Sequence, residues 1–421
     1  MFKKEFLDNK IPVLMETAKE ARSLCIGIWV KVGARYERPD KNGVSHFLEH
    51  MFFKGTVGRT AEGIAMEIDS LGGEINALTS SEYTLFYVKV LDEYINKAED
   101  LLTDIFLNST FPETDIEKEK SIINEEIKMV EDTPSDYVHD LFSRNVWGET
   151  GLGMSVLGQS EIIGEFKRND LLEHIGRFYG TENIVAACSG NFREEEFMGY
   201  LNRSLGSLQR SGEKKNEPPP EFRSGLNVIS KDLSEAHVCL GVKGLPYSSE
   251  DRYSMHLLNT ILGSGYSSRL FQNIREKRGL AYSIHSYHAS YSDAGIWVIY
   301  AGTDRKKVSE IINITMDEMR GLHETITSDE LQRAKAQLKG NLILALESTS
   351  NKMTNIAKQE IYYGKYLAPD EIIRLVDSLT LDNVKDLAQR ITGDDRFALT
   401  VYGPVKDEDI YPISFLGHQQ G

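Results

Sequence analysis

The sequence predicts an α+β protein with two homologous domains, each a mainly antiparallel sheet backed by helices. Two observations favour this fold class: a proline-rich segment divides the 421 residues almost in half, and similar strand patterns recur in both halves. In each half, segments with period-two alternation are followed by long helical patterns, which is typical of a sheet with helices packed against it. A half of about 200 residues is long enough to bury a core of its own.

The composition changes at the segment that divides the chain, residues 208–226, LQRSGEKKNEPPPEFRSGL. Its three consecutive prolines can neither continue a helix nor pair inside a sheet, and glycine and charged residues surround them. We therefore predict a first domain over residues 1–211, a linker over residues 212–225 and a homologous second domain over residues 226–421.

The two halves share an expected strand and the order of the elements after it. SLCIGIWVKVGARYE, from residue 23, matches AHVCLGVKGLPYSSED, from residue 236. Helical patterns, a glycine and alternating segments follow in both halves: GGEINALTSSEYTLFYVKVL in the first and RGLAYSIHSYHASYSDAGIWVIYAG in the second. Amphipathic helices are expected next, for example over residues 93–107 and 305–322. This repetition indicates a duplicated unit.

Composition and charge exclude several classes of protein. The formal charge of −16 opposes general binding to nucleic acid or acidic membrane surfaces, and no apolar run approaches the roughly 20 residues of a membrane span. Acidic residues at positions 5, 8 and 16 interrupt the region where an export signal would be apolar. Three distant cysteines, Cys25, Cys188 and Cys239, are expected to be buried free thiols. A cytoplasmic location is therefore expected.

One motif, GVSHFLEHMFFKGT at residues 43–56, places two histidines and a glutamate within five positions. On a helix, His50 lies about 40° and Glu49 about −60° from His46, so all three project from one side. The neighbouring apolar stripe, which would hold the helix on the sheet, consists of Val44, Phe47, Leu48 and Met51. Two imidazoles one turn apart are suited to one zinc ion, and the adjacent carboxylate is suited to act as a general base on water bound there.

A third metal ligand is expected from the helical segment DIEKEKSIINEEIKMVED, residues 115–132. Glu119 and Glu126 fall on or beside its apolar stripe, whereas Glu125 points about 100° away. The stripe consists of Ile116, Ile123, Ile127 and Val130. A carboxylate on the packed side of a helix is costly unless it is paired or binds a metal. Glu126 is therefore the predicted ligand and Glu119 a supporting carboxylate; the alternative is a helix with a tilted stripe and solvated glutamates.

Together these motifs resemble the inverted zinc-peptidase family of pitrilysin, insulin-degrading enzyme and mitochondrial processing peptidase, which carries an H-x-x-E-H motif. The resemblance covers nearly the whole chain, through GVSHFLEHMFFKGT, LGGEINALTSSEYT, EKEKSIINEEIKMVEDTP and GSGYSSRLFQNIREKRGLAYSI. The length, sufficient for two such domains, is similar to that of the processing-peptidase and bacterial branch.

The resemblance implies a zinc-dependent endopeptidase that hydrolyses peptides or unfolded polypeptide segments, with the first domain catalytic. It implies one Zn²⁺ per chain, held by His46, His50 and Glu126, with Glu49 activating water. Glu119 would help to orient the site. The expected partner is a peptide substrate, with no role for nucleic acid or membrane.

Four further residues are assigned to the substrate by this resemblance. Asn76 and Ala77 would lie on an edge strand that pairs with an extended peptide. Arg275 and Tyr282 would reach the scissile bond from a second-type domain that faces a zinc domain, which in a two-domain chain implies a homodimer with composite active sites. An alternative for REKRG, around Arg275, is an ordinary helix C-terminus with basic residues and a glycine cap.

Only one half is expected to perform chemistry, because the second-half segment aligned with the histidine motif, LNTILGSGYSS, has no histidine or carboxylate. An alternative function is a noncatalytic peptide-binding or assembly subunit of the same fold. Relatives of that kind lack part of the zinc set, whereas every position is present here. A second alternative is a metal-dependent hydrolase of nonpeptide substrates, against which the edge-strand motif argues.

Overall fold

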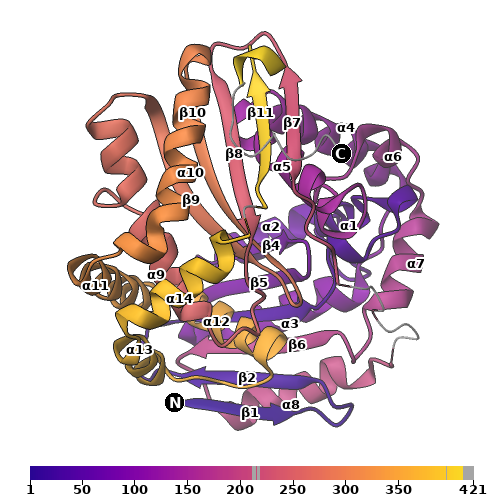
Figure 1. The fold of residues 1–421 in the computed structure, drawn as a ribbon. Helices are drawn as coiled ribbons and strands as arrows, with labels where there is room; N and C mark the ends of the chain where they lie inside the picture. The colour runs from indigo at the N-terminus through magenta and orange to yellow at the C-terminus, as the bar shows by residue number, and fades with distance from the viewer. Residues whose placement is uncertain (211–214, 216–218, 395, 411–421) are drawn as a thin grey trace. The chain divides into compact units, whose positions relative to one another are not determined.

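The computed structural model describes residues 1–210, 215, 219–394 and 396–410, which form two compact units drawn in Figure 1. The first unit contains Met1–Met129, Thr150–Pro218 and Ala345–Tyr366; the second contains Val130–Glu149, Pro219–Leu344 and Leu367–Gly421. Each unit therefore includes one segment from the other half of the sequence. Most of the predicted linker's N-terminal part, 212–214 and 216–218, and residues 411–421 of the predicted second domain lie outside the described residues. The predicted domain boundaries stay a prediction.

The first unit contains a six-stranded sheet in the order β1-β2-β6-β3-β5-β4. Neighbouring strands are antiparallel except β2 and β6, which are parallel. The strands are β1 Phe2–Phe6, β2 Pro12–Thr17, β3 Ser23–Val30, β4 Glu74–Thr79, β5 Thr84–Leu91 and β6 Ile184–Gly190. Its helices are α1 Val44–Phe52, α2 Ala61–Ser70, α3 Ile95–Asn108, α4 Glu113–Glu131, α6 Ser160–Gly164, α7 Arg168–Phe178, α8 Glu194–Ser204 and α12 Thr349–Tyr363.

Both faces of the central strand β3 are buried, which explains its continuous apolar run. Leu24, Ile26 and Ile28 face a core shared with α1, α3, α7 and α8. On the opposite face, Cys25 and Trp29 pack with residues of α12. Successive side chains of a strand point to opposite faces, so a central strand covered on both sides needs apolar residues at every position.

The second unit contains a five-stranded sheet in the order β7-β11-β8-β10-β9. Neighbours are again antiparallel except for one pair, β7 and β11. The strands are β7 Gly225–Ser230, β8 Ala236–Lys243, β9 Ala281–Ser290, β10 Gly295–Thr303 and β11 Ala398–Gly403, and Figure 1 shows four of them side by side in the order β10, β8, β11, β7. This order repeats that of the first sheet without β1. The predicted α+β class with two similar domains is confirmed.

The helices of the second unit are α5 Pro134–Trp147, α9 Arg252–Leu262, α10 Val308–Thr325, α11 Ser328–Ala345, α13 Pro369–Ser378 and α14 Leu381–Thr392. Residues from α9, α10 and α14 share a core with one face of the sheet. Helix α5, from the first half of the sequence, packs against β11 and β8.

A central glycine in each sheet receives the helix that comes from the other half of the sequence. A Cβ atom added to Gly27 in β3 would lie 2.6 Å from Sδ of Met353 in α12. A Cβ on Gly241 in β8 would lie 2.7 Å from Cζ of Phe142 in α5. These glycines occupy matching places in the two repeated strand sequences. We call α12 and α5 the exchanged helices, because each packs in the unit formed mainly by the other half of the sequence. The sequence repeat therefore includes the close contact between a central strand and an exchanged helix.

Cys25, Cys188 and Cys239 are buried and free, which confirms the expectation for the thiols. Burial raises the pKa of Cys25 to about 12, so the thiol stays protonated at neutral pH. Within the described ranges, no helix is both long and apolar enough to cross a membrane.

Candidate active site

Helix α1 carries the histidine motif on one side and an apolar stripe on the other. The stripe is buried: it consists of Val44, Phe47, Leu48 and Met51. His46 is also buried, whereas Glu49 and His50 are partly exposed. The stripe anchors the helix in the core of the first unit, so the three polar side chains face away from that core.

The side chains of His46, His50 and Glu126 converge. Oε2 of Glu126 lies 3.6 Å from Nε2 of His46 and 3.5 Å from Nε2 of His50. Zinc–ligand bonds of about 2.0–2.1 Å at tetrahedral angles would separate neighbouring ligand atoms by about 3.4 Å. The three residues therefore fit a zinc ion, with both imidazoles binding through Nε2. Across the described part of the chain, this is the one group of three or more His, Cys, Asp or Glu side chains with ligand atoms so close.

His46 is kept uncharged by its surroundings. Burial, together with the nearby His50, lowers the pKa of His46 to about 4. Neutral imidazole is the metal-binding form, so His46 can bind a cation at neutral pH without first losing a proton. Its second ring nitrogen, Nδ1, is buried and has no hydrogen-bond partner among the residues that the structure describes.

The Nδ1 atom of His50 contacts a carboxylate. This atom lies 2.9 Å from Oε2 of Glu119, a buried residue of α4. The other carboxylate oxygen, Oε1, lies 2.6 Å from Nζ of Lys54. A carboxylate that accepts Nδ1–H selects the tautomer whose Nε2 lone pair is free for a metal, so Glu119 orients His50 and Lys54 balances the charge of Glu119.

Glu49 is held by a residue of the neighbouring strand. Oγ1 of Thr79, the last residue of β4, donates a hydrogen bond of 2.6 Å to Oε2 of Glu49. Burial raises the pKa of Glu49, although the Thr79 hydrogen bond and the nearby His50 act in the opposite direction. A carboxylate with a raised pKa holds a proton more readily than an exposed one, which suits a group that shuttles protons.

Strand β4, which carries Asn76 and Ala77, is the terminal strand of its sheet. Asn76 lies opposite Tyr87 of β5, and Ala77 lies opposite Phe86. Ala77 and Thr79 point to the face that carries α1, because Thr79 reaches Glu49 and alternate residues share a face. Asn76 is exposed on the other face. The end of β4 is thus in contact with the candidate site through Thr79, while the Asn76 side chain is not on the side of Glu49.

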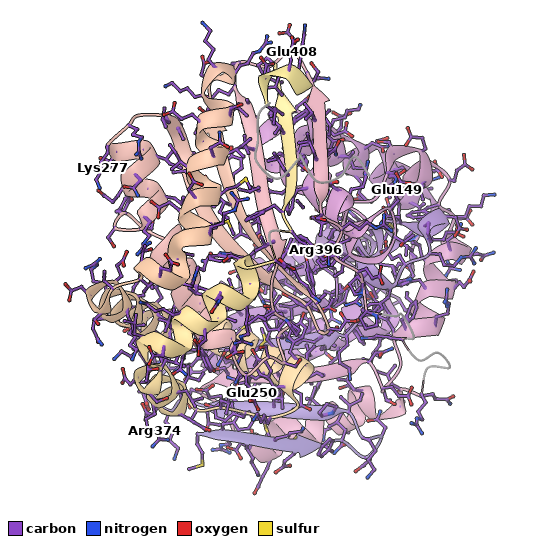
Figure 2. The ribbon with its side chains drawn as sticks, viewed as in Figure 1. Glu149, Glu250, Lys277, Arg374, Arg396 and Glu408 are labelled. Atoms are coloured by element: carbon purple, nitrogen blue, oxygen red, sulfur yellow. The ribbon has the colours of Figure 1, made fainter. Side chains whose placement is uncertain are left out.

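Arg275 and Tyr282 belong to the second unit. Arg275 lies in a π-helical segment, Phe271–Glu276, and its guanidinium carbon is 4.8 Å from the ring centroid of Phe271. Lys277, labelled in Figure 2, follows this segment directly. Tyr282 is 79% exposed on β9, the terminal strand of the second sheet. The structure therefore brings together the site residues of the first unit, and their relation to Arg275 and Tyr282 stays a prediction.

Sequence reasoning missed two of the residues that hold this site. Thr79 follows Ala77 at the strand period, so alternation could have placed it on the α1 face. Lys54 follows His50 at helical spacing, just beyond the last residue of α1. Neither threonine nor lysine is a usual zinc ligand, so a search by ligand type passed over both.

Comparison with known proteins gives matches over most of the chain. Residues 12–160 match the family described as Insulinase (Peptidase family M16), and residues 165–338 match the Peptidase M16 inactive domain. An uncharacterized zinc protease of Bacillus subtilis (strain 168), YmxG, is 41% identical over 405 residues, which are 96% of this chain and 98% of that protein. An uncharacterized zinc protease of Rickettsia felis is 38% identical over 386 residues, 91% of this chain and 93% of that protein.

Solved structures show the same fold at lower sequence identity. A peptidase M16 inactive domain from Pseudomonas fluorescens matches with a TM-score of 0.89 at 18% identity, covering 96% of this chain and 98% of that one. A protease from Helicobacter pylori matches with a TM-score of 0.87 at 21% identity, covering 96% and 99%. The resemblance found in the sequence motifs is confirmed: with relatives named zinc proteases that align over nearly their full length, the chain belongs to the insulinase family, peptidase family M16.

Proposed function

We propose that this protein is a zinc-dependent endopeptidase that cleaves peptides or unfolded polypeptide segments. The observation that carries the proposal is the convergence of His46, His50 and Glu126 at ligand spacing, with Glu49 on the same helix. When bound there, zinc would supply Lewis-acid chemistry, acidifying a water molecule and polarising a carbonyl group. The relatives named zinc proteases support this reading.

Glu49 is the proposed general base. Its carboxylate takes a proton from the attacking water and then passes that proton to the amine of the leaving peptide. The hydrogen bond from Thr79 to Oε2 fixes the orientation of the carboxylate, which leaves Oε1 to exchange the proton. Glu119 keeps His50 in the tautomer that binds metal throughout the reaction.

The substrate is proposed to bind as an extended strand along β4. A terminal strand presents unpaired backbone groups at its outer edge, and an extended peptide satisfies them by adding a further strand. This mode of binding needs a free backbone, so it favours peptides and unfolded segments over folded proteins. Asn76 and Ala77 would take part through their backbone groups, and the substrate would replace the hydrogen bond of 2.8 Å that the Ala77 N–H donates to Oδ1 of Asn76.

A homodimer with composite active sites is part of the proposal. Arg275 and Tyr282 are exposed in the second unit, where they are available to a substrate. Tyr282 would donate a hydrogen bond to the oxygen that gains charge in the transition state, and Arg275 would bind the substrate backbone. In a two-domain chain these residues would come from the partner subunit.

The test is cleavage of internally quenched peptides by the wild-type protein and by Glu49→Gln, each with its zinc content measured. We expect both proteins to hold zinc, and we expect the variant to lose several orders of magnitude in kcat because its amide cannot accept a proton. The matched control is Glu125→Gln, which changes an exposed glutamate of α4 that pairs with Lys128. If neither wild type nor variant cleaves any peptide while both hold zinc, the noncatalytic peptide-binding alternative replaces the proposal.

A further inference from the structure

A buried glutamate that precedes α1, Glu37, binds the N-terminus of this helix. Its side chain is 5% exposed. Oε2 accepts a hydrogen bond of 2.6 Å from the backbone N–H of Gly43, and Oε1 accepts one of 2.7 Å from the backbone N–H of Ser45. The two oxygens therefore satisfy two of the backbone donors that a helix leaves unpaired at its start.

Glu37 takes the place of the usual capping residue. The N-cap position of α1 is Gly43, which has no side chain to accept a hydrogen bond. A carboxylate at the N-terminus of a helix also interacts favourably with the positive end of the helix dipole. The cap of α1 is thus a side chain from a separate turn of the chain. Burial raises the pKa of Glu37, and the hydrogen bonds to its oxygens act in the opposite direction. Both oxygens accept hydrogen bonds from N–H donors, which is the arrangement of a carboxylate.

The cap is itself fixed by a second segment of the same unit. Nδ2 of Asn42 donates to Oε2 of Glu37 at 3.0 Å and to the carbonyl oxygen of Ser155 at 2.9 Å. Beside it, a Cβ on Gly43 would lie 2.8 Å from Cα of Gly158, so the two backbones are in direct contact. Glu37, the start of α1 and the segment from Ser155 to Gly158 form one hydrogen-bonded assembly, with little room for the helix start to shift.

This assembly bears on the metal site through His46. His46 directly follows Ser45, whose N–H is bound by Glu37. His50 is oriented by Glu119, but Nδ1 of His46 has no hydrogen-bond partner among the described residues. The orientation of the His46 ring therefore depends on its backbone and on packing. In addition, the positive end of the α1 dipole lies next to a site for a dication, and the charge of Glu37 offsets that repulsion.

We propose that Glu37 is a positioning residue for the metal site, which fixes His46 through the backbone of α1 and compensates the helix dipole near the cation. The inference rests on the proposed zinc site but not on peptide cleavage. The two proposed zinc ligands on α1 are then held by different means. Glu119 contacts the His50 ring directly, whereas Glu37 holds His46 through the backbone at the start of the helix.

The test is the affinity of Glu37→Gln for zinc and for cobalt, measured by competition with a chromophoric chelator. Glutamine has nearly the same shape as glutamate, but it has no charge. Its NH₂ group is a hydrogen-bond donor, so it cannot accept a hydrogen bond from the backbone N–H that it would face. We expect the dissociation constant to rise about tenfold or more, in the range seen when groups that orient metal ligands are changed. The visible spectrum of the cobalt form should change as well, because the His46 ring is less well held. With saturating metal, KM for a peptide should stay near the wild-type value.

Thr60→Val is the matched control for lost capping. Oγ1 of Thr60 accepts a hydrogen bond of 3.0 Å from the N–H of Gly63 at the start of α2, a helix of the same unit that carries no metal ligand. We expect this variant to lose thermal stability and keep its metal affinity. Equal metal affinity in wild type, Thr60→Val and Glu37→Gln would overturn the proposal and reduce Glu37 to an ordinary helix cap.

A second variant, Asn42→Ala, covers the case in which Glu37→Gln does not fold. It removes one hydrogen bond to Glu37 and keeps the charge. We expect a smaller loss of metal affinity, severalfold, with unchanged metal stoichiometry. Unchanged affinity in Asn42→Ala together with an unfolded Glu37→Gln would contradict the positioning role. A wild-type protein that binds metal but cleaves no peptide would contradict the proposed function and leave the role of Glu37 in metal binding intact.

Discussion

Oε2 of Glu119 lies 2.9 Å from Nδ1 of His50, on the side of the imidazole ring opposite to Glu126. His50 is thus placed between two carboxylates of α4, one that supports it and one that faces the proposed metal position. The seven-residue spacing of these glutamates puts both on one face of the helix, where Glu119 is buried and Glu126 is partly exposed. This division of roles leads directly to the first prediction.

Glu119→Gln should weaken zinc binding by about 10-fold to 100-fold, because the amide is a weaker acceptor for Nδ1–H and Lys54 loses its ionic partner. The measurement is the zinc dissociation constant by chelator competition. Glu125→Gln, a change on the exposed side of the same helix, is the control and should bind zinc as the wild type does. Equal affinity in both variants would mean that Glu119 does not support the ligand.

The local parts of the site were predictable, because helical and strand periods place residues relative to their own element. Spacing alone put His46, Glu49 and His50 on one side of α1, and the apolar stripe of α4 identified Glu119 and Glu126. The contact between Thr79 and Glu49 was not predictable in this way, because it depends on how β4 packs against α1. Periodicity says which face a residue occupies, but not which side chain of another element it meets.

The exchanged helices show the same limit at the level of the fold. The apolar residues of α12, among them Met353 and Ile356, predict a buried helix. Nothing in that pattern says that the helix packs on the sheet of the first unit, because a hydrophobic stripe is not specific for one sheet. The matching glycines, Gly27 and Gly241, hold that information, but only once a Met or Phe side chain is known to lie above them.

A mixing experiment tests the proposed composite site. Glu49→Gln and Tyr282→Phe chains should each be nearly inactive alone, and a mixture that exchanges subunits should recover activity. If Tyr282 acts across the dimer, one site in each mixed dimer combines an intact Glu49 with an intact Tyr282. Random exchange at equal concentrations would then restore about a quarter of the wild-type activity. No recovery, with subunit exchange shown by labelled chains, would mean that both residues act within one chain.

The two central glycines should differ in their tolerance of alanine. Gly241→Ala would push its Cβ against the Phe142 ring and the Trp297 carbonyl oxygen, at 2.7 and 2.9 Å. Neither can move easily, so we expect a loss of about 1–3 kcal/mol, as in overpacked cores. Gly27→Ala would meet the flexible end of Met353, which can adopt another rotamer, so a smaller loss is expected. Urea unfolding midpoints of the two variants give the comparison, and a larger loss for Gly27→Ala would contradict it.

Glu99 should make the protein less stable as the pH rises. Its side chain on α3 is buried, and Oε1 has no hydrogen-bond partner among the described residues. Burial raises the pKa of Glu99 to about 8 from 4.5, although Arg203 acts in the opposite direction. The folded protein therefore keeps a proton that the unfolded chain releases above its own pKa, so the free energy of unfolding falls as the pH rises from about 4.5 to about 8.

Glu99→Gln removes this dependence, because the amide is neutral in both states. We expect similar stability of wild type and variant near pH 4.5, and at pH 8 a variant that is more stable by roughly 1–3 kcal/mol, after allowance for relaxation around the buried charge. Urea unfolding at both pH values measures the difference. Glu93→Gln, at an exposed position just before the same helix, is the control and should leave the pH dependence unchanged. A stability gap that does not widen with pH would show that Glu99 is already ionised in the folded protein, and its charge would then have to be met by Arg203.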